Sequence, residues 1–162
     1  MKKPEESVVN EASIPWTEQG HGDGYLVRRK RLGAAAGGER IGTSLIELPP
    51  GKRSWPLHLH MANEEAIYVL DGTATLRLAD REFPLRAGDY VALPAGLTHP
   101  HQIVNTSDAP LRYLAISTLI DPEVTLYPDS NKVGVIHGNP GSRTLFEFYP
   151  RDGAVDYWKG ED

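Results

Sequence analysis

The chain has 162 residues, with 17 lysines and arginines against 22 aspartates and glutamates, so its formal net charge at pH 7 is −5. A domain that binds nucleic acid usually carries a surplus of basic residues, so this charge disfavours partners held by their phosphates. The sequence contains six histidines and no cysteine, which excludes disulfides and cysteine nucleophiles and leaves nitrogen and oxygen as the ligands of any bound metal.

The length suits one domain with a substantial core. No apolar run approaches the ~18 residues of a membrane-spanning helix. The opening residues Met1, Lys2 and Lys3 are not followed by an apolar segment, so no signal peptide is predicted. We expect a soluble cytoplasmic protein that acts on a small molecule and has neither a nucleic-acid nor a membrane partner.

The first part of the chain differs from the middle. Residues 1 to about 24 are polar and rich in glycine, proline and glutamate, which indicates a loose arm or an added edge strand. The basic run 28–31 is expected to form the solvated face of an edge strand. We therefore assign residues 1–41 to an N-terminal arm and edge strands.

Residues 42–119 carry the pattern of an all-β core. In the segment 73–78, apolar and polar residues alternate, as a half-buried strand requires. Turn sequences rich in glycine, proline and aspartate separate this segment from its neighbours at regular intervals, which predicts a compact barrel or sandwich. Residues 120–162 are rich in aromatic side chains, so this C-terminal extension is expected to pack on the barrel or on a second subunit.

His58 and His60 form the sharpest local feature. Two residues apart on a strand, they project from the same face, as two imidazoles that bind one ion must do. Taken alone, such a pair more often lies on a solvent or core face than in a metal site. A tight turn through residues 61–64 would bring Glu65 onto the face of the histidines, with Ile67 and Val69 continuing its row, while Glu64 would be a supporting or surface carboxylate.

A second histidine cluster follows in residues 88–105. Taken together, the segments GKRSWPLHLHMANEEAIYVLDG (51–72) and GDYVALPAGLTHPHQIVN (88–105) resemble the paired signature of the cupin superfamily. In family terms the two motifs are G-X(5)-H-X-H-X(3,4)-E-X(6)-G and G-X(5)-P-X-G-X(2)-H-X(3)-N. One departure is that Gly51 precedes His58 by one residue more than the family pattern has.

The second motif offers two histidines. His99 has the family spacing from Gly96, whereas His101 has the family spacing to Asn105. Pro100 cannot donate to a strand ladder and favours a strand that starts just after it. We therefore take His101 as the ligand and place His99 at the mouth of the cavity.

The resemblance implies a cupin double-stranded β-helix, a jelly-roll barrel. It implies one divalent transition metal held inside by His58, His60, Glu65 and His101. Three imidazoles and a carboxylate suit Mn, Fe, Co, Ni or Zn.

Similarity to small single-domain cupins of the sugar-phosphate-isomerase kind implies a metal-dependent sugar or sugar-phosphate isomerase. His99 is then the first candidate for the base and Glu64 the second, and the cations nearest in sequence for a substrate phosphate are Lys52, Arg53 and Arg77. An Fe(II)-dependent dioxygenase and a non-catalytic small-molecule-binding cupin are the alternatives. Edge strands and arms of such barrels pair readily, so we expect a homodimer.

Overall fold

The computed structural model describes residues 4–138 and 142–161, so the prediction made on Met1, Lys2 and Lys3 lies outside the described residues. No helix in these ranges is both long enough and apolar enough to span a membrane.

The described residues form one α-helix, α1 (Leu32–Ala36), and four 3-10 turns, which are Pro4–Ser7, Glu11–Ser13, Pro128–Ser130 and Arg151–Gly153. The strands are β1 (Thr17–His21), β2 (Tyr25–Lys30), β3 (Ile41–Leu48), β4 (Leu59–His60), β5 (Glu65–Asp71), β6 (Thr73–Leu78), β7 (Arg81–Arg86), β8 (Tyr90–Leu93), β9 (His101–Val104), β10 (Leu111–Thr118), β11 (Glu123–Tyr127), β12 (Lys132–His137) and β13 (Leu145–Pro150).

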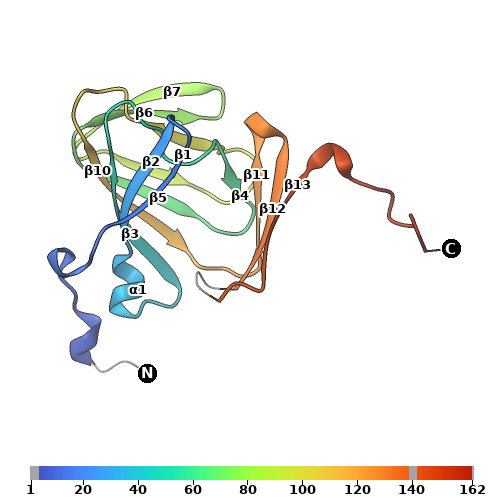
Figure 1. The fold of residues 1–162 in the computed structure, drawn as a ribbon, viewed down its shortest axis with the longest axis horizontal. Coiled ribbons are helices and arrows are strands. Elements are labelled where there is room, and N and C mark those ends of the chain that lie inside the picture. The colour runs from blue at the N-terminus through green and yellow to red at the C-terminus, as the bar shows by residue number, and fades with distance from the viewer. Residues whose placement is uncertain (1–3, 139–141, 162) are drawn as a thin grey trace.

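The strands form two walls of a jelly-roll barrel, as the sequence predicted. One wall is a six-stranded sheet of order β1-β2-β3-β10-β5-β8. The other consists of a three-stranded sheet, β7-β6-β9, and a four-stranded sheet, β13-β12-β11-β4. A backbone bridge between His58 and His101 links the last two sheets, because His58 lies directly before β4 and His101 begins β9. Figure 1 shows β11, β12 and β13 closing one side of the barrel.

The core lies between the two walls, where the alternating apolar residues of each strand meet. On β5, Ile67 and Val69 are buried, whereas Tyr68 and Leu70 on the other face are exposed. The buried core residues are Val27, Ile46, Leu48, Ile67, Val69, Ala74, Leu76, Leu85, Leu93, Ile103, Leu111 and Tyr113. The glycine between β5 and β6, Gly72, has a φ of +84°, and a Cβ there would lie 2.6 Å from the carbonyl oxygen of Pro110. The turn therefore needs glycine for both its conformation and its close approach.

The N-terminal region adds β1 and β2 to the edge of the six-stranded sheet. The expected solvated face of the run 28–31 holds for Arg28, which is exposed and pairs with Glu18 and Glu47. It is wrong for Lys30, which is 8% exposed. Residues 11–16 cover Lys30, whose Nζ donates a hydrogen bond of 2.8 Å to the Glu11 carbonyl and lies 4.6 Å from the centre of the Trp16 ring.

One part of the C-terminal extension belongs to the barrel wall, and the other part extends beyond the barrel. Strand β11 pairs with β4, so it completes the barrel beside the two histidines of the first motif. Beyond β13 the chain extends away from the barrel (Figure 1). Tyr157 and Trp158 in this last segment are 83% and 70% exposed.

Candidate metal centre

The structure brings together the four side chains that were predicted as metal ligands. Ligand atoms of His58, His60, Glu65 and His101 all lie within 4.8 Å of one another. His60 comes from β4, Glu65 from the start of β5 and His101 from the start of β9. Each of the three sheets therefore contributes one side chain to the cluster.

Backbone pairing fixes the positions of two of these ligands. His58 and His101 exchange both backbone hydrogen bonds, at 3.2 and 2.8 Å. Directly opposed residues of an antiparallel pair project from the same face, so both rings point into the barrel. Their ring centres are 4.6 Å apart.

Backbone carbonyl groups also orient these two rings. The Nδ1 atom of His58 lies 2.8 Å from the Pro56 carbonyl oxygen, and that of His101 lies 3.0 Å from the His99 carbonyl oxygen. A ring whose Nδ1 donates to a carbonyl presents its Nε2 to an ion. The Nε2 atom of His101 already lies 3.0 Å from Oε2 of Glu65, and that of His60 lies 3.5 Å from the same oxygen.

The residues present fit a divalent transition metal. Both ring nitrogens of His60 are buried and have no hydrogen-bond partner among residues 4–138 and 142–161, although buried polar atoms are normally satisfied. An ion between the four side chains would supply the partner that the Nε2 of His60 lacks. Three nitrogen ligands and one carboxylate form a set suited to Mn, Fe, Co, Ni or Zn, and ligand type does not select among them.

Burial and neighbouring charges set the protonation of the cluster. Burial, with the nearby His101, lowers the pKa of His58 to about 4, so this ring is a neutral ligand at pH 7. Burial alone would raise the pKa of Glu65, but the hydrogen bond with His101 and the charge of the nearby His60 hold it well below its usual range. Burial would lower the pKa of His60, but the carboxylates of Glu123 and Glu65 raise it to about 9.

Metal binding should therefore release about one proton at pH 7, because His60 carries a proton below its pKa and must lose it to become a ligand. Calorimetric titration of the metal-free protein with Zn²⁺ in buffers of different ionisation enthalpy measures this number. We expect the release to decline as the pH is raised toward 9. A binding heat that is independent of the buffer at pH 7 would contradict the assignment.

Glu123 supports the site, and sequence reasoning missed it. The residue is 6% exposed, and its carboxylate accepts hydrogen bonds from the backbone amides of Met61, Ala62 and Asn63 at 3.0, 3.1 and 2.9 Å, and from the Asn63 side chain. Its Oε2 also lies 3.6 Å from Nδ1 of His60. Burial would raise the pKa of Glu123, but His60 and the amide donors lower it to about 2. The carboxylate thus holds the turn that brings Glu65 back into phase with the histidines.

Asn105, the last residue of the second motif, has a structural role. It is fully buried, and its Nδ2 donates to the carbonyl oxygens of Leu48 and Ala109, both at 2.8 Å. Its Oδ1 accepts from the backbone amide of Ser107 at 3.0 Å. Asn105 therefore fixes the end of β9 and, through it, the position of His101 four residues earlier.

The two predicted base candidates lie outside the ligand cluster. His99 is half-buried, its Nδ1 lies 2.8 Å from the Thr98 hydroxyl, and its carbonyl orients His101. Glu64 is exposed and follows the turn, one position out of phase with Glu65. Their catalytic roles stay predictions.

The structure does not bring the three predicted phosphate-binding cations to the cluster. Arg77 on β6 is opposite Gln102, not His101, and forms an ion pair of 2.9 Å with Asp129. The backbone of Lys52 bonds with that of Asn105, and at ~3.3 Å per residue this end of β9 lies about 13 Å from His101. Nζ of Lys52 donates to the Asp23 carbonyl at 2.6 Å, and Arg53 lies over the Tyr25 ring. These three cations were chosen because they are near the ligands in the sequence. Neighbouring residues of a strand, however, project from opposite faces of the sheet, so nearness in sequence did not place these side chains near the ligand cluster.

Three histidines and one glutamate converge inside a barrel of this topology. The protein therefore belongs to the class of double-stranded β-helix proteins, and it has a candidate metal centre. The family described as "Cupin domain" matches residues 44–117. The chain belongs to the cupin superfamily.

Two solved structures match nearly the whole chain. A sugar phosphate isomerase of the cupin superfamily from Silicibacter pomeroyi is 30% identical, with a TM-score of 0.80, over 91% of this chain and 94% of that one. A protein from Acidithiobacillus ferrooxidans, provisionally assigned as a sugar phosphate isomerase, is 28% identical, with a TM-score of 0.82, over 95% of this chain and 98% of that one.

Curated relatives match over shorter stretches. Quercetin 2,3-dioxygenase of Bacillus subtilis is 36% identical over 87 residues, which are 52% of this chain and 26% of the dioxygenase. Among the curated relatives it matches, the chain covers at most 60% of their length.

Proposed function

We propose that the protein is a metal-dependent isomerase of sugars or sugar phosphates. The observation that carries the proposal is the cluster of His58, His60, Glu65 and His101, whose ligand atoms lie within 4.8 Å of one another. Similarity to the Silicibacter pomeroyi sugar phosphate isomerase over 94% of its length supports this reaction class.

The proposed reaction moves a proton between two adjacent carbons of the substrate. A divalent ion in the cluster would polarise the substrate carbonyl oxygen. The chain must then supply a base that reaches both carbons. His99 is our first candidate, because it lies two residues from His101 and its Nδ1 contacts the Thr98 hydroxyl, whereas its Nε2 has no hydrogen-bond partner among the described residues. The ring of Tyr127, stacked on His58 with centres 6.1 Å apart, would form a wall of the substrate site.

Incubation of the metal-loaded protein with a panel of aldose and ketose phosphates in D₂O tests the proposal. We expect interconversion and deuterium incorporation at the carbon beside the carbonyl, both followed by NMR. The metal-free protein is the matched control. Absence of deuterium exchange across the panel with Mn, Fe, Co, Ni and Zn in turn would contradict the isomerase proposal. Saturable binding of a sugar phosphate without turnover would instead indicate a binding protein.

A dioxygenase is the second candidate, because the chain is 36% identical to part of quercetin 2,3-dioxygenase. The same ligand set suits Fe(II). Oxygen uptake by the iron-loaded protein in the presence of quercetin, measured with an oxygen electrode, would favour this activity. Absence of oxygen uptake under these conditions would contradict the dioxygenase activity.

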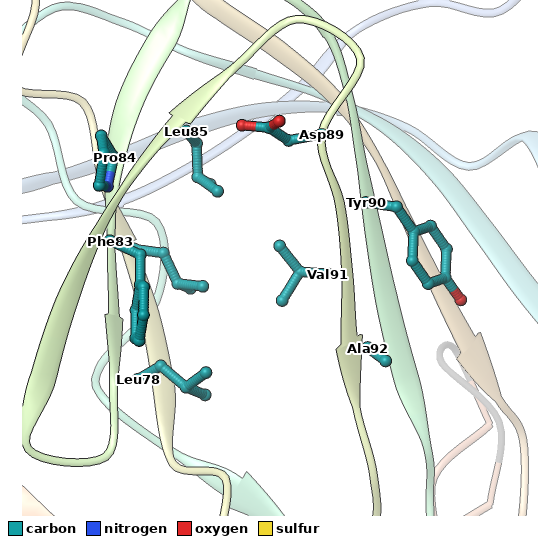
Figure 2. Close-up of a pocket in the computed structure, with 9 residues that line it drawn as sticks. Leu78, Phe83, Pro84, Leu85, Asp89, Tyr90, Val91 and Ala92 are labelled. Atoms are coloured by element: carbon teal, nitrogen blue, oxygen red, sulfur yellow. The ribbon is translucent and has the colours of Figure 1, made fainter.

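We also propose that the protein forms a homodimer. The exposed aromatic side chains of Tyr157 and Trp158 lie on a segment that extends away from the barrel (Figure 1). An apolar pocket of about 350 Å³ opens between the strand pair β6 and β7 and the edge strand β8. Figure 2 shows Val91 projecting into this pocket from β8, opposite Leu78, Phe83 and Leu85. A second copy that covers these surfaces would remove apolar area from water.

Sedimentation velocity at micromolar concentration should show a dimer. Replacing Tyr157 and Trp158 together by serine should shift the distribution toward monomer, whereas Glu161→Gln in the same segment should not. A wild-type monomer at this concentration would contradict the proposal.

A further inference from the structure

A row of four residues crosses the four-stranded sheet on the face that carries the metal ligand His60. The strand register places directly opposite one another, from β4 to β13, the residues His60, Thr125, Gly134 and Phe148. Directly opposed residues of antiparallel strands project from the same face of a sheet. The side chain of Phe148 therefore lies on the inner face of this wall, the face from which His60 reaches the ligand cluster.

The ring of Phe148 lies against Gly134. A Cβ at residue 134 would be 2.8 and 3.0 Å from two atoms of the Phe148 ring, and 2.6 Å from Oγ1 of Thr125. Any side chain at this position would displace the ring, so the close approach requires glycine. The ring of Phe148 thus lies across β12 and extends from the edge strand toward the ligand cluster.

A second row on the same face contains Tyr127 and Lys132. Tyr127 lies two residues after Thr125 and directly opposite Lys132, so these three side chains share a face. The Tyr127 ring is stacked on that of His58 with centres 6.1 Å apart, and it lies 5.7 Å from the Phe148 ring. Nζ of Lys132 lies 5.4 Å from the centre of the Tyr127 ring. Lys132 and Phe148 therefore both contact a ring that itself contacts a metal ligand.

Lys132 carries a charge that an anionic ligand can pair with. The ion pairs formed among residues 4–138 and 142–161 do not include this lysine. Its ammonium group lies within the distance at which the face of the Tyr127 ring attracts a cation, so the ring helps to hold it in place. A cation held beside the metal centre without a carboxylate partner attracts the anionic group of a ligand.

Water reaches the interior of the barrel at the level of the metal ligands. Phe148 is 40% exposed, although it lies on the inner face of its wall. On the opposite wall, the inner-face positions of β10 and β3 beside Glu65 hold small, half-buried residues, which are Ser117, Ala115, Ser44 and Gly42. Deeper along β10, Tyr113 fills the core and is 1% exposed. The small residues leave room for a ligand between the two walls.

We propose that Phe148, Tyr127 and Lys132 form a subsite for the phosphorylated end of a sugar phosphate whose carbonyl end meets the metal centre. The two aromatic rings contact the C–H groups of the carbon chain, and Lys132 binds the phosphate. The Tyr127 hydroxyl accepts a hydrogen bond of 3.3 Å from Thr125, so it can donate its own proton to a ligand oxygen.

The subsite rests on the proposed isomerase function and narrows it, because it selects sugar phosphates over free sugars. It also assigns the phosphate to a cation other than the three predicted from nearness in sequence, which are Lys52, Arg53 and Arg77. Lys132 is remote from the ligands in the sequence, and the pairing of β4, β11 and β12 brings it to them.

Binding of sorbitol 6-phosphate to the Zn²⁺-loaded protein tests the subsite without turnover, because this compound has no carbonyl group to isomerise. Isothermal titration should show saturable binding that is at least about tenfold tighter than that of sorbitol, as expected for one charge-assisted hydrogen bond. Lys132→Gln should remove this difference by weakening the binding of sorbitol 6-phosphate alone. Lys132→Arg should keep most of it.

The aromatic part of the subsite has its own variant. Phe148→Ala should weaken the binding of both sorbitol 6-phosphate and sorbitol about threefold to tenfold, because contacts with the ring are lost. Tyr149→Ala is the matched control, since Tyr149 is the next residue of β13, is 47% exposed and projects from the other face. Lys159→Gln, at an exposed position, is the control for charge. Each control should change binding less than about twofold.

The outcomes separate the subsite from the isomerase function. Equal effects of Lys132→Gln and Lys159→Gln, or no saturable binding by the wild type at millimolar sorbitol 6-phosphate, overturn the subsite. Equal effects of Phe148→Ala and Tyr149→Ala overturn its aromatic part. Binding that depends on Lys132 and Phe148, without turnover of any sugar phosphate, contradicts the isomerase and leaves the subsite standing. Turnover of a sugar phosphate with a KM unchanged by Lys132→Gln contradicts the subsite alone.

Discussion

Replacing His101 by alanine should abolish metal retention, whereas replacing His99 should leave it intact. His101 contributes one of four ligand atoms that lie within 4.8 Å of one another. Loss of a ligand should weaken metal affinity by more than the ~10–100-fold typical of substitutions in supporting residues. The fold should survive, because the hydrogen bonds between His58 and His101 in the barrel wall are made by backbone atoms.

Elemental analysis of protein purified without added metal measures this difference directly. The visible spectrum of the Co²⁺-loaded protein gives a second readout, because it reports the ligands themselves. His99→Ala is the matched control, since it removes an imidazole two residues away and keeps the backbone carbonyl that orients His101. Loss of metal from His99→Ala with retention by His101→Ala would reverse the ligand assignment.

Replacing Glu123 by glutamine should weaken metal affinity about tenfold to a hundredfold and lower the free energy of unfolding by about 2–3 kcal/mol. The buried carboxylate accepts hydrogen bonds from three consecutive backbone amides, which a neutral amide group cannot do equally well. Without it, the turn between His60 and Glu65 loses its anchor. Glu147→Gln on β13, where the side chain is exposed, is the control and should change neither quantity measurably.

The pH dependence of unfolding provides an independent check on Glu123. Its pKa is lowered from 4.5 to about 2, so its contribution to stability is present above pH 4.5 and is lost as the pH falls through about 2. The gap in unfolding free energy between wild type and Glu123→Gln should therefore narrow from pH 7 to pH 2. Urea titrations at several pH values measure the gap, and a gap that stays constant with pH would mean that the charge of Glu123 is not the source of its effect.

Much of the barrel and its ligand set could be predicted from the sequence, because both depend on local rules. A two-residue period decides which face a strand residue takes, and this rule placed His58, His60 and Glu65 together once a turn was assumed at 61–64. Pro100 favoured a strand that begins after it, and β9 does begin at His101.

Features that depend on long-range pairing could not be predicted. Glu123 reaches residues 61–63 only because β11 pairs with β4, some 60 positions away in the chain, and nothing near either strand indicates this register. Arg29 was expected on a solvated face, yet its pairing with Ile46 turns it toward the core side. A local alternation shows that two faces differ, but it does not show which face the rest of the protein covers.

The distribution of the ligands over the sheets has a thermodynamic consequence. His60, Glu65 and His101 belong to three different sheets, which are also joined by apolar packing, by the bridge between His58 and His101 and by the ion pair of Arg77 with Asp129. An ion that binds the folded chain and not the unfolded one stabilises the fold in proportion to the logarithm of its concentration above Kd, by about 4 kcal/mol at a thousandfold excess. A cross-link of this kind makes the resistance of the barrel to heat a function of metal supply, which melting curves with and without a chelator would resolve.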